Sequence, residues 1–326
     1  MLTTGEINGH RTLWLENDLL KIAVLPEKGA EIHKFIHKPS GVDFLLKTPA
    51  GLQPPGTTLE KDFLDNYGGG WQELFPNTGD PCEHKGISFR FHGEVALLRW
   101  TDRVERADAE LTSVVFSVRC DKTQTRLQRH MTLRQGQPSL EIEEAVTNGS
   151  TTLVEFVWGH HIVLGGDFLE NGCRLDIPAR TVITPEELYE PATARLAPGQ
   201  REIWPMARGR NPGQRIDLRH IPGPEAHSHD DAFVTDLSHG RLSVTNLRKA
   251  LEFVLEWNAG LFRYVTLWQP YGGADLSPLT GIYGVGIEPW VSRFSLAQAS
   301  RHGESIRLEP NQTLSTMLRT SVTGSS

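Results

Sequence analysis

The sequence has few cysteines and no excess of positive charge. Its three cysteines, Cys82, Cys120 and Cys173, lie far apart and form no C-x-x-C pair. This spacing argues against a disulfide framework and against a thiolate zinc site, so we expect free thiols. The formal net charge is −7, with acidic and basic residues mixed along the chain. A basic stripe for nucleic acid and a polybasic membrane anchor are both missing, and we expect neither kind of partner.

Long apolar runs are also missing. No segment approaches the ~18 apolar residues that a membrane-spanning helix needs, and the N-terminal stretch has acidic and polar residues in place of an apolar signal core. A cytoplasmic protein is the resulting expectation. Hydrophobic residues nevertheless make up 38% of the 326 residues, and charged residues 22%. This balance is typical of a folded chain that buries a sizeable core.

Helical periodicity is scarce, whereas short alternating or apolar runs between turn-forming residues are frequent. This pattern is typical of an all-β protein, and many strands without a short repeat predict a large antiparallel β-sandwich. Residues 58–65 are expected to form a short helical turn. The expected strands cover residues 12–15, 20–25, 32–37, 95–104, 111–119, 125–133, 139–147, 154–161, 232–236, 241–246, 252–256, 264–269 and 305–308.

The segment 185–224 is rich in Pro, Gly and Arg. It is either a long irregular excursion or a linker between two units. Candidate functional residues fall on both sides of it, at His92, His161 and Glu288, so a shared site requires both halves to pack together. We expect residues 1–326 to form a single β-sandwich domain.

The segment Phe89-Arg90-Phe91-His92-Gly93 alternates aromatic and polar residues. On a strand, Phe89 and Phe91 would face a core, while Arg90 and His92 would share the opposite face. A guanidinium offers a rigid fork of donors that suits sugar hydroxyls or a carboxylate, so the pair suggests a polar site. The alternative is that His92 is a buried histidine bonded to a backbone carbonyl.

Two adjacent histidines, His160 and His161, follow the apolar run at 153–158. Regular alternation would send them to opposite faces, with His160 toward a core and His161 on the more polar face of Glu155. A bulge at Gly159 would invert that assignment. Both histidines therefore stay candidates for a site.

Glu288 stands among glycines and apolar residues in the stretch 283–290. Alternation puts Gly284 and Gly286 on the same face, leaving space beside the carboxylate in which a sugar ring could lie flat. A carboxylate in apolar surroundings is expected to have a raised pKa, which suits a base that works near neutrality. The alternative is an edge-strand glutamate that faces water.

The sequence His227-Ser228-His229-Asp230-Asp231 has the spacing that puts two imidazoles on one strand face. With an acidic third ligand it could hold a divalent metal. The competing interpretation is a polar loop before a strand, because no further ligand set stands out. We expect neither a metal nor a cofactor.

Seven short motifs, taken together, resemble the aldose 1-epimerase (galactose mutarotase-like) superfamily. Each motif is short, and their shared order and spacing along almost the whole chain carry the resemblance. They lie at residues 24–32, 91–93, 159–161, 230–233, 267–270, 286–289 and 306–314.

The resemblance implies a many-stranded β-supersandwich that binds a free sugar on its open face. It implies that Glu288 is the general base, that His161 is the general acid, and that His92 orients the substrate. Arg90, Asp230 and Gln269 match positions that line the sugar pocket. Because Gly-His-His-Ile-Val replaces the common Asn-His-x-Tyr-Phe form of the second histidine motif, His160 is kept with His161 as a candidate substrate-binding residue.

Tryptophans such as Trp71, Trp268 and Trp290 have flat apolar rings that could stack on a pyranose. The predicted function is a mutarotase that acts on a small free sugar, as a monomer or a homodimer. Two alternatives stay open: a non-catalytic carbohydrate-binding protein of the same fold, and a metal-dependent sugar isomerase that uses His227 and His229.

Overall fold

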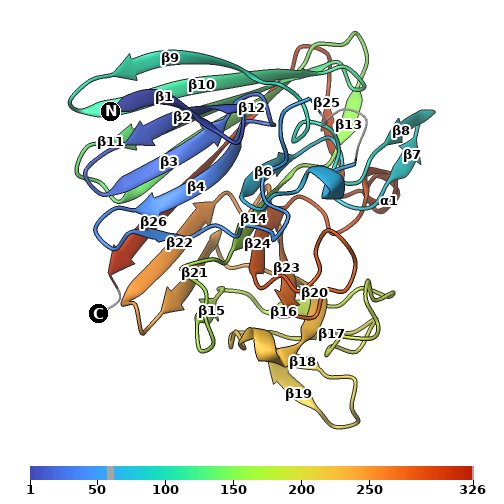
Figure 1. Cartoon of the computed structure of the whole chain (residues 1–326). Coiled ribbons are helices and arrows are strands. Elements are labelled where there is room, and N and C mark those ends of the chain that lie inside the picture. Colours follow the sequence, from blue (N-terminus) through green and yellow to red (C-terminus); the bar gives the residue numbers. More distant parts are fainter. Residues whose placement is uncertain (57–61, 325–326) are drawn as a thin grey trace.

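The computed structural model describes residues 1–56 and 62–324. Two large antiparallel sheets dominate this part of the chain (Figure 1). The larger, twelve-stranded sheet contains, in spatial order, β1 (Leu2–Ile7), β2 (His10–Glu16), β3 (Leu20–Leu25), β4 (Glu31–His37), β6 (Trp71–Leu74), β14 (Gly159–Leu164), β24 (Val285–Trp290), β23 (Tyr264–Tyr271), β20 (Ser228–Thr235), β16 (Thr181–Ile183) and β17 (Arg201–Ile203), with β5 (Val42–Asp43) pairing with β4.

The smaller, eight-stranded sheet and the remaining elements complete the fold. In spatial order this sheet contains β15 (Arg174–Asp176), β21 (Arg241–Asn246), β22 (Leu251–Trp257), β26 (Thr313–Gly324), β12 (Ser139–Asn148), β11 (Thr125–Arg134), β10 (Leu111–Cys120) and β9 (Thr101–Ala107). Short strands pair as β7 (Cys82–His84) with β8 (Ile87–Phe89), β13 (Val154–Phe156) with β25 (Ile306–Leu308), and β18 (Met206–Arg208) with β19 (Arg215–Asp217). The helical segments are η1 (Leu64–Asn66), η2 (Pro224–Ala226) and α1 (Leu296–His302). The all-β prediction is confirmed.

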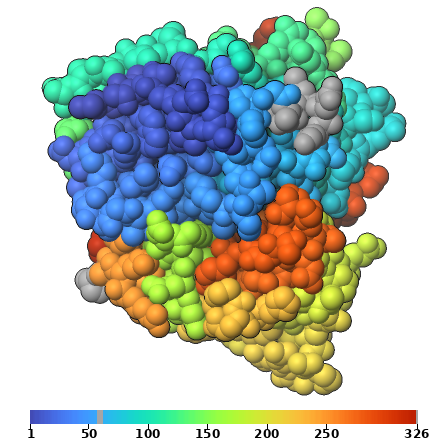
Figure 2. Space-filling view, viewed as in Figure 1, coloured from blue at the N-terminus to red at the C-terminus, as the bar shows by residue number. Residues whose placement is uncertain are grey.

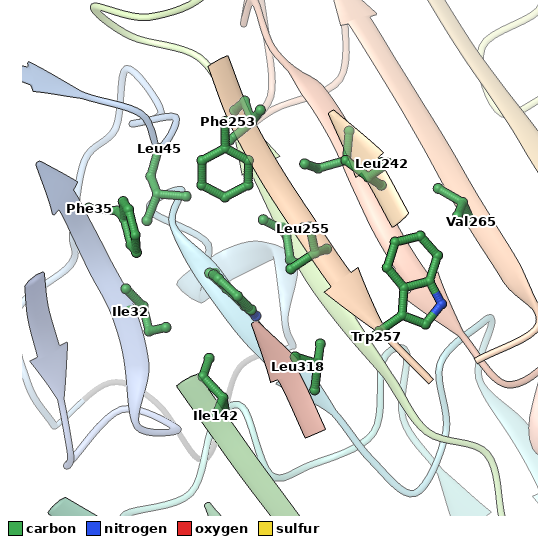
Figure 3. Close-up of a cluster of buried hydrophobic side chains, with 14 of the residues drawn as sticks. Ile32, Phe35, Leu45, Ile142, Leu242, Phe253, Leu255, Trp257, Val265 and Leu318 are labelled. Atoms are coloured by element: carbon green, nitrogen blue, oxygen red, sulfur yellow. The ribbon is translucent and has the colours of Figure 1, made fainter. Parts of the chain in front are cut away.

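The main core fills the space between the sheets. Figure 3 shows side chains from both sheets meeting there, such as Phe35 from β4 and Phe253 from β22. The Phe253 ring lies 5.7 Å from that of Phe35 and 5.6 Å from that of Phe44. Truncating such a fully buried ring to Ala typically costs about 3–5 kcal/mol, so this layer holds the two sheets in one arrangement.

Two predicted strands differ clearly from the structure, and several strands, β26 among them, were not predicted. The strand predicted at 95–104 begins only at Thr101, because residues 95–98 form a turn and a bend. The strand predicted at 154–161 divides into β13 and β14, with Val157 and Trp158 between them. The twelve-residue strand β26 was missed because polar residues occupy many of its positions, several of them exposed to solvent.

The predicted helical turn at 58–65 falls partly outside the described residues, and η1 at Leu64–Asn66 overlaps its C-terminal end. The segment 185–224 contains three short strands, of which β17 joins the larger sheet. All three cysteines are free, as predicted. In the described part of the chain, no helix is both long and apolar enough to cross a membrane.

Strand β14 occupies the position in the larger sheet that matters most for the site. It pairs with β6 on one side and with β24 on the other, so it unites three segments that lie far apart in sequence. Figure 2 shows the same convergence at the surface, where early segments in blue meet late segments in orange. Side chains from both halves of the chain can therefore face one pocket.

Candidate active site

A cavity of about 430 Å³ opens on the face of the larger sheet formed by β14, β24, β23 and β20. This volume lies within the range of small-molecule sites. Its walls combine aromatic rings with titratable groups, and they include Tyr67, Asp80, Phe91, His92, His161, Glu187, Tyr189, Asp231, Phe233, Thr266, Trp268, Glu288, Trp290 and Arg293.

Strand register decides which side chains face this cavity. Residues directly opposite each other on paired strands share a face of the sheet. Glu288 on β24 is opposite Thr266 on β23, and Trp268 on β23 is opposite Asp231 on β20. All four residues line the cavity, so three neighbouring strands contribute to one wall.

His161 and Glu288 face each other in this wall. Nε2 of His161 lies 3.7 Å from Oε1 of Glu288, which is longer than a hydrogen bond. Both side chains are buried, and within residues 1–56 and 62–324 neither His161 Nδ1 nor Glu288 Oε1 has a hydrogen-bond partner. Buried polar atoms are normally paired, so these two atoms are candidates for binding a ligand.

Burial shifts the ionisation of these groups toward their neutral forms. Desolvation raises the pKa of Glu288 well above its ordinary value, and the charge of Asp231 adds to this effect. Desolvation also lowers the pKa of His161 well below its ordinary value, helped by the neighbouring His92. The expectation of a raised pKa for Glu288 agrees with this direction.

The space expected beside Glu288 is occupied by protein. A Cβ atom added at Gly286 would lie 2.8 Å from Cβ of Trp268 and would also collide with Glu288. The glycine therefore makes room for Cβ of Trp268 and for the carboxylate itself. A sugar ring would lie in front of these groups rather than on the glycine.

His92 does not belong to a strand, which corrects the prediction that Arg90 and His92 share a strand face. Strand β8 ends at Phe89, and His92 adopts a left-handed conformation with φ of 60° before Gly93 at 74°. This turn brings the tilted rings of Phe91 and His92 together with centroids 3.7 Å apart, and both line the cavity. Arg90 is not among the described residues that line it.

His92 is also held by the backbone, as its alternative interpretation predicted. Its Nδ1 is hydrogen-bonded to the carbonyl oxygen of Thr78. Burial lowers the pKa of His92 to about 3, although the bond to Thr78 opposes this shift. Its ring lies 5.5 Å from that of His161, so a neutral imidazole lies next to His161 and Glu288.

His160 lies on the opposite face of β14, inside the protein core. Trp71 Nε1 donates to Nδ1 of His160 at 3.1 Å, and Nε2 of His160 lies 3.1 Å from Oε2 of Glu144. Arg129 bridges Glu144 and Glu73 behind it. Regular alternation thus holds at the histidine pair, and the structure brings neither His160 nor Trp71 to the cavity.

Asp230 and Gln269 also point away from the cavity. Asp230 accepts hydrogen bonds from the backbone N–H groups of Arg195 and Leu196 and from Nε of Arg195, each at 2.8 Å. Arg195 donates to Oε1 of Gln269 at 3.0 Å. The adjacent Asp231 faces the cavity instead, and burial together with the charge of Asp230 raises its pKa to about 6.

The H-x-H sequence at 227–229 does not form a paired ligand set. His227 is exposed, and its Nδ1 lies 2.9 Å from the carbonyl oxygen of Gly272. His229 is buried, and each of its ring nitrogens is hydrogen-bonded to another side chain. Within residues 1–56 and 62–324, no group of three or more His, Cys, Asp or Glu side chains is arranged to hold a metal ion.

Several polar residues of the cavity were not assigned to the site from the sequence, among them Asp231, Tyr67 and Thr266. Asp231 could have been found by alternation from Phe233, which shares its face. Tyr67 and Thr266 carry hydroxyls that are buried and have no partner among the described residues. Only the fold brings their segments, a loop and the strand β23, to the wall that holds Glu288.

Comparison with solved structures identifies the same fold in several bacterial proteins. Slr1438 from Synechocystis sp. PCC 6803 is 20% identical with a TM-score of 0.69, and the match covers 98% of this chain and 99% of that one. A galactose mutarotase related enzyme from Lactobacillus acidophilus is 15% identical, with a TM-score of 0.65 and coverage of 97% and 98%. A galactose mutarotase-like protein from Clostridium acetobutylicum is also 15% identical, with a TM-score of 0.65 and coverage of 99% and 98%.

At these identities the likeness is one of fold, and it confirms the predicted galactose mutarotase-like β-supersandwich. A family model matches residues 7–198 of the chain, which is more than half of its length, and this family is described as a domain of unknown function, DUF4432. The chain therefore belongs to the DUF4432 family and has the galactose mutarotase-like fold.

Proposed function

We propose that this chain is an aldose 1-epimerase, which interconverts the α and β anomers of a free sugar. The observation that carries the proposal is the facing pair of His161 and Glu288, 3.7 Å apart in the wall of an aromatic-lined cavity. Each residue has a polar atom that no other described residue satisfies. An acid and a base on one wall match the chemistry of anomer exchange.

The reaction needs one base and one acid. Glu288 removes the proton of the C1 hydroxyl while His161 donates a proton to the ring oxygen. The bond between C1 and the ring oxygen breaks, and the C1–O1 bond becomes a carbonyl. After rotation about the C1–C2 bond, the reverse transfers close the ring on the other face. Protons balance over the cycle, and positioned acid–base catalysis contributes about 10²–10⁴-fold.

The pair carries one proton through this cycle. The raised pKa of Glu288 and the lowered pKa of His161 favour the form in which the carboxyl holds that proton. Ring opening starts from the other form, with Glu288 ionised and His161 protonated, and it ends in this favoured form because Glu288 gains a proton as His161 loses one. Activity should fall at low pH, where the pair gains a second proton, and at high pH, where it loses the only one.

Several neighbours are proposed to bind the sugar. Asp231 takes the hydroxyl-binding role that the resemblance suggested for Asp230, and Trp268 offers an indole face to the ring. Tyr67 and Thr266 supply unpartnered hydroxyls. His92, neutral and fixed by its carbonyl bond, contributes its remaining nitrogen to substrate orientation.

The test is the relaxation of freshly dissolved α-anomers across a panel of free aldoses, followed by polarimetry or NMR and corrected for the uncatalysed rate. The Glu288→Gln variant keeps the side-chain shape and removes the base. We expect it to lose about 10²–10⁴-fold in kcat. Glu256→Gln, on β22 of the other sheet, is the matched control and should keep full activity.

Two results would contradict the proposal. Full activity of Glu288→Gln on the best substrate would exclude Glu288 as the base. Sugar binding without any acceleration across the panel would favour a non-catalytic carbohydrate-binding protein instead.

A further inference from the structure

A chain of hydrogen bonds runs from the interior to one wall of the cavity. Nδ1 of His229 lies 2.8 Å from Oε2 of Glu190, and Nε2 of His229 lies 2.6 Å from Nε1 of Trp268. His229 is 2% exposed, so water does not compete for these bonds. The indole of Trp268 forms part of the cavity wall, with its ring 5.6 Å from that of His161.

The chemistry of the three groups fixes the direction of both bonds. An indole N–H can only donate, so Nε2 of His229 must accept from Trp268. In the neutral imidazole the proton then resides on Nδ1, which donates to the carboxylate of Glu190. Each of the three groups therefore has one possible role as donor or acceptor in these bonds, and both ring nitrogens of His229 have a partner.

Glu190 is anchored by more than the histidine. Its carboxylate accepts from the backbone N–H groups of Asp275 and Leu276, at 3.2 and 3.0 Å. Burial acts to raise the pKa of Glu190, but the bonds from His229 and from the backbone outweigh it and leave the pKa lowered. An ionised carboxylate therefore accepts every bond at this end of the chain.

The position of Glu190 connects three parts of the cavity. Its own loop carries Glu187 and Tyr189, which line the cavity. The loop of Asp275 and Leu276 carries a further lining residue, Leu279. Through His229, the same carboxylate also reaches the Trp268 indole on β23.

We infer that Glu190 and His229 form a positioning relay that holds the indole of Trp268 in one orientation for the sugar. The role in sugar binding rests on the proposed function, whereas the orientation of the indole does not. His229 and Glu190 are positioning residues in this scheme, because only Trp268 contacts the ligand. A tilted indole would weaken stacking on the sugar and leave the proton-transferring pair in place.

The core contains a similar arrangement that serves as an internal reference. Trp71 donates to Nδ1 of His160, whose other nitrogen lies against Glu144. This set lies on the opposite face of β14 and shares no residue with the relay. Changes confined to the Trp268 signal can therefore be separated from changes in the whole fold.

The first test needs no sugar. In protein labelled with ¹⁵N at tryptophan, the indole N–H resonance of Trp268 is assigned by its loss in Trp268→Phe, and that of Trp71 by its loss in Trp71→Phe. We expect His229→Leu to shift the Trp268 resonance and to speed its exchange with solvent by about tenfold or more. His229→Gln, whose carbonyl can accept the indole bond, should restore part of the wild-type shift.

Glu190→Gln is the decisive variant, because Glu190 does not bond to Trp268 directly. A relay predicts that this variant shifts the Trp268 resonance while that of Trp71 stays unchanged. The matched control is His227→Gln, two residues from His229 but exposed and bonded to Gly272, which should shift neither. An unchanged Trp268 resonance in Glu190→Gln would overturn the relay, even if His229→Leu moves it.

The second test asks whether the relay serves the sugar. With the aldose that relaxes fastest as the probe, Glu190→Gln and His229→Gln should raise KM about three- to tenfold, as expected for a disturbed aromatic contact, with kcat within about threefold. A fall in kcat at constant KM would contradict the positioning role. If no aldose is accelerated, the proposed function fails, but the resonance of Trp268 still decides the relay.

Discussion

Two adjacent histidines on strand β14 have different surroundings in this protein, one in the core and one in the cavity wall. His160 and His161 are both almost completely buried, at 0% and 5% exposure, so burial alone does not separate them. Their partners do. Both ring nitrogens of His160 are bonded to core side chains, whereas Nδ1 of His161 has no partner among the described residues and Nε2 faces Glu288.

The difference teaches that saturation of hydrogen bonds, more than burial, separates a structural histidine from one available for chemistry. An unpaired buried polar atom costs free energy. Among the described residues, Nδ1 of His161 is nevertheless unpaired, and so is Oε1 of Glu288 beside it in the cavity wall. The adjacent aspartates show a related contrast, because Asp230 is bound by Arg195 and Asp231 lines the cavity.

The largest expected difference between the two histidines is their effect on catalysis. His161→Asn should lower kcat for anomer exchange by about 10²–10⁴-fold, because the proposed acid is lost. The measurement is polarimetry of a fresh α-aldose, with circular dichroism to check the fold. Activity above a tenth of wild type would show that His161 is not the acid.

The second effect is on stability, and it concerns His160. Replacing it by Leu leaves the indole N–H of Trp71 and the carboxylate of Glu144 without their partner in a dry core. The free energy of unfolding should fall by about 3–5 kcal/mol, measured by urea denaturation. His161→Leu is the matched variant and should lower the free energy of unfolding clearly less. Equal losses in the two variants would show that the two histidines contribute alike to stability.

The third effect is the pH dependence of stability, which tests whether His92 stays neutral in the folded protein. The pKa of His92 falls from 6.5 to about 3 on folding, so the unfolded chain binds the proton first. The stabilisation is present above pH 6.5 and is lost as the pH falls toward 3, at about 1.4 kcal/mol per pH unit.

Urea denaturation at several pH values between 7 and 4 measures this slope, and His92→Asn should reduce it by about that amount per unit. An unchanged slope in the variant would show that His92 is protonated in the folded protein.

The smallest effect compares the two aspartates. Asp231→Asn should raise KM for the best aldose about fivefold, roughly 1 kcal/mol of lost hydrogen bonding, with kcat little changed. Asp230→Asn weakens the bonds from Arg195 and should lower the free energy of unfolding while KM stays constant. A raised KM in Asp230→Asn together with an unchanged KM in Asp231→Asn would show that Asp230, and not Asp231, binds the sugar.

Part of the site was predictable because alternation along a strand is a local property. The sequence 154–161 sent His160 and His161 to opposite faces, and the structure agrees even though the strand breaks at Val157 and Trp158. Alternation failed at Arg90 and His92, where a left-handed turn at His92 replaces the expected strand. Such a turn depends on contacts with distant segments, including the Thr78 carbonyl.

The amino-acid sequence by itself determined the all-β class, the free cysteines and the order of motifs that indicated the galactose mutarotase-like fold. The all-β class follows from the two-residue period of strands and the free thiols from the cysteine spacing, whereas the motifs indicate the fold only through their resemblance to a known superfamily. Only the tertiary structure decided that Tyr67, Asp231 and Thr266 join Glu288 in one wall and that His160 and Asp230 stay outside it. The pairing of β14, β24, β23 and β20 brings together residues far apart in the chain, and no local pattern records which strands become neighbours.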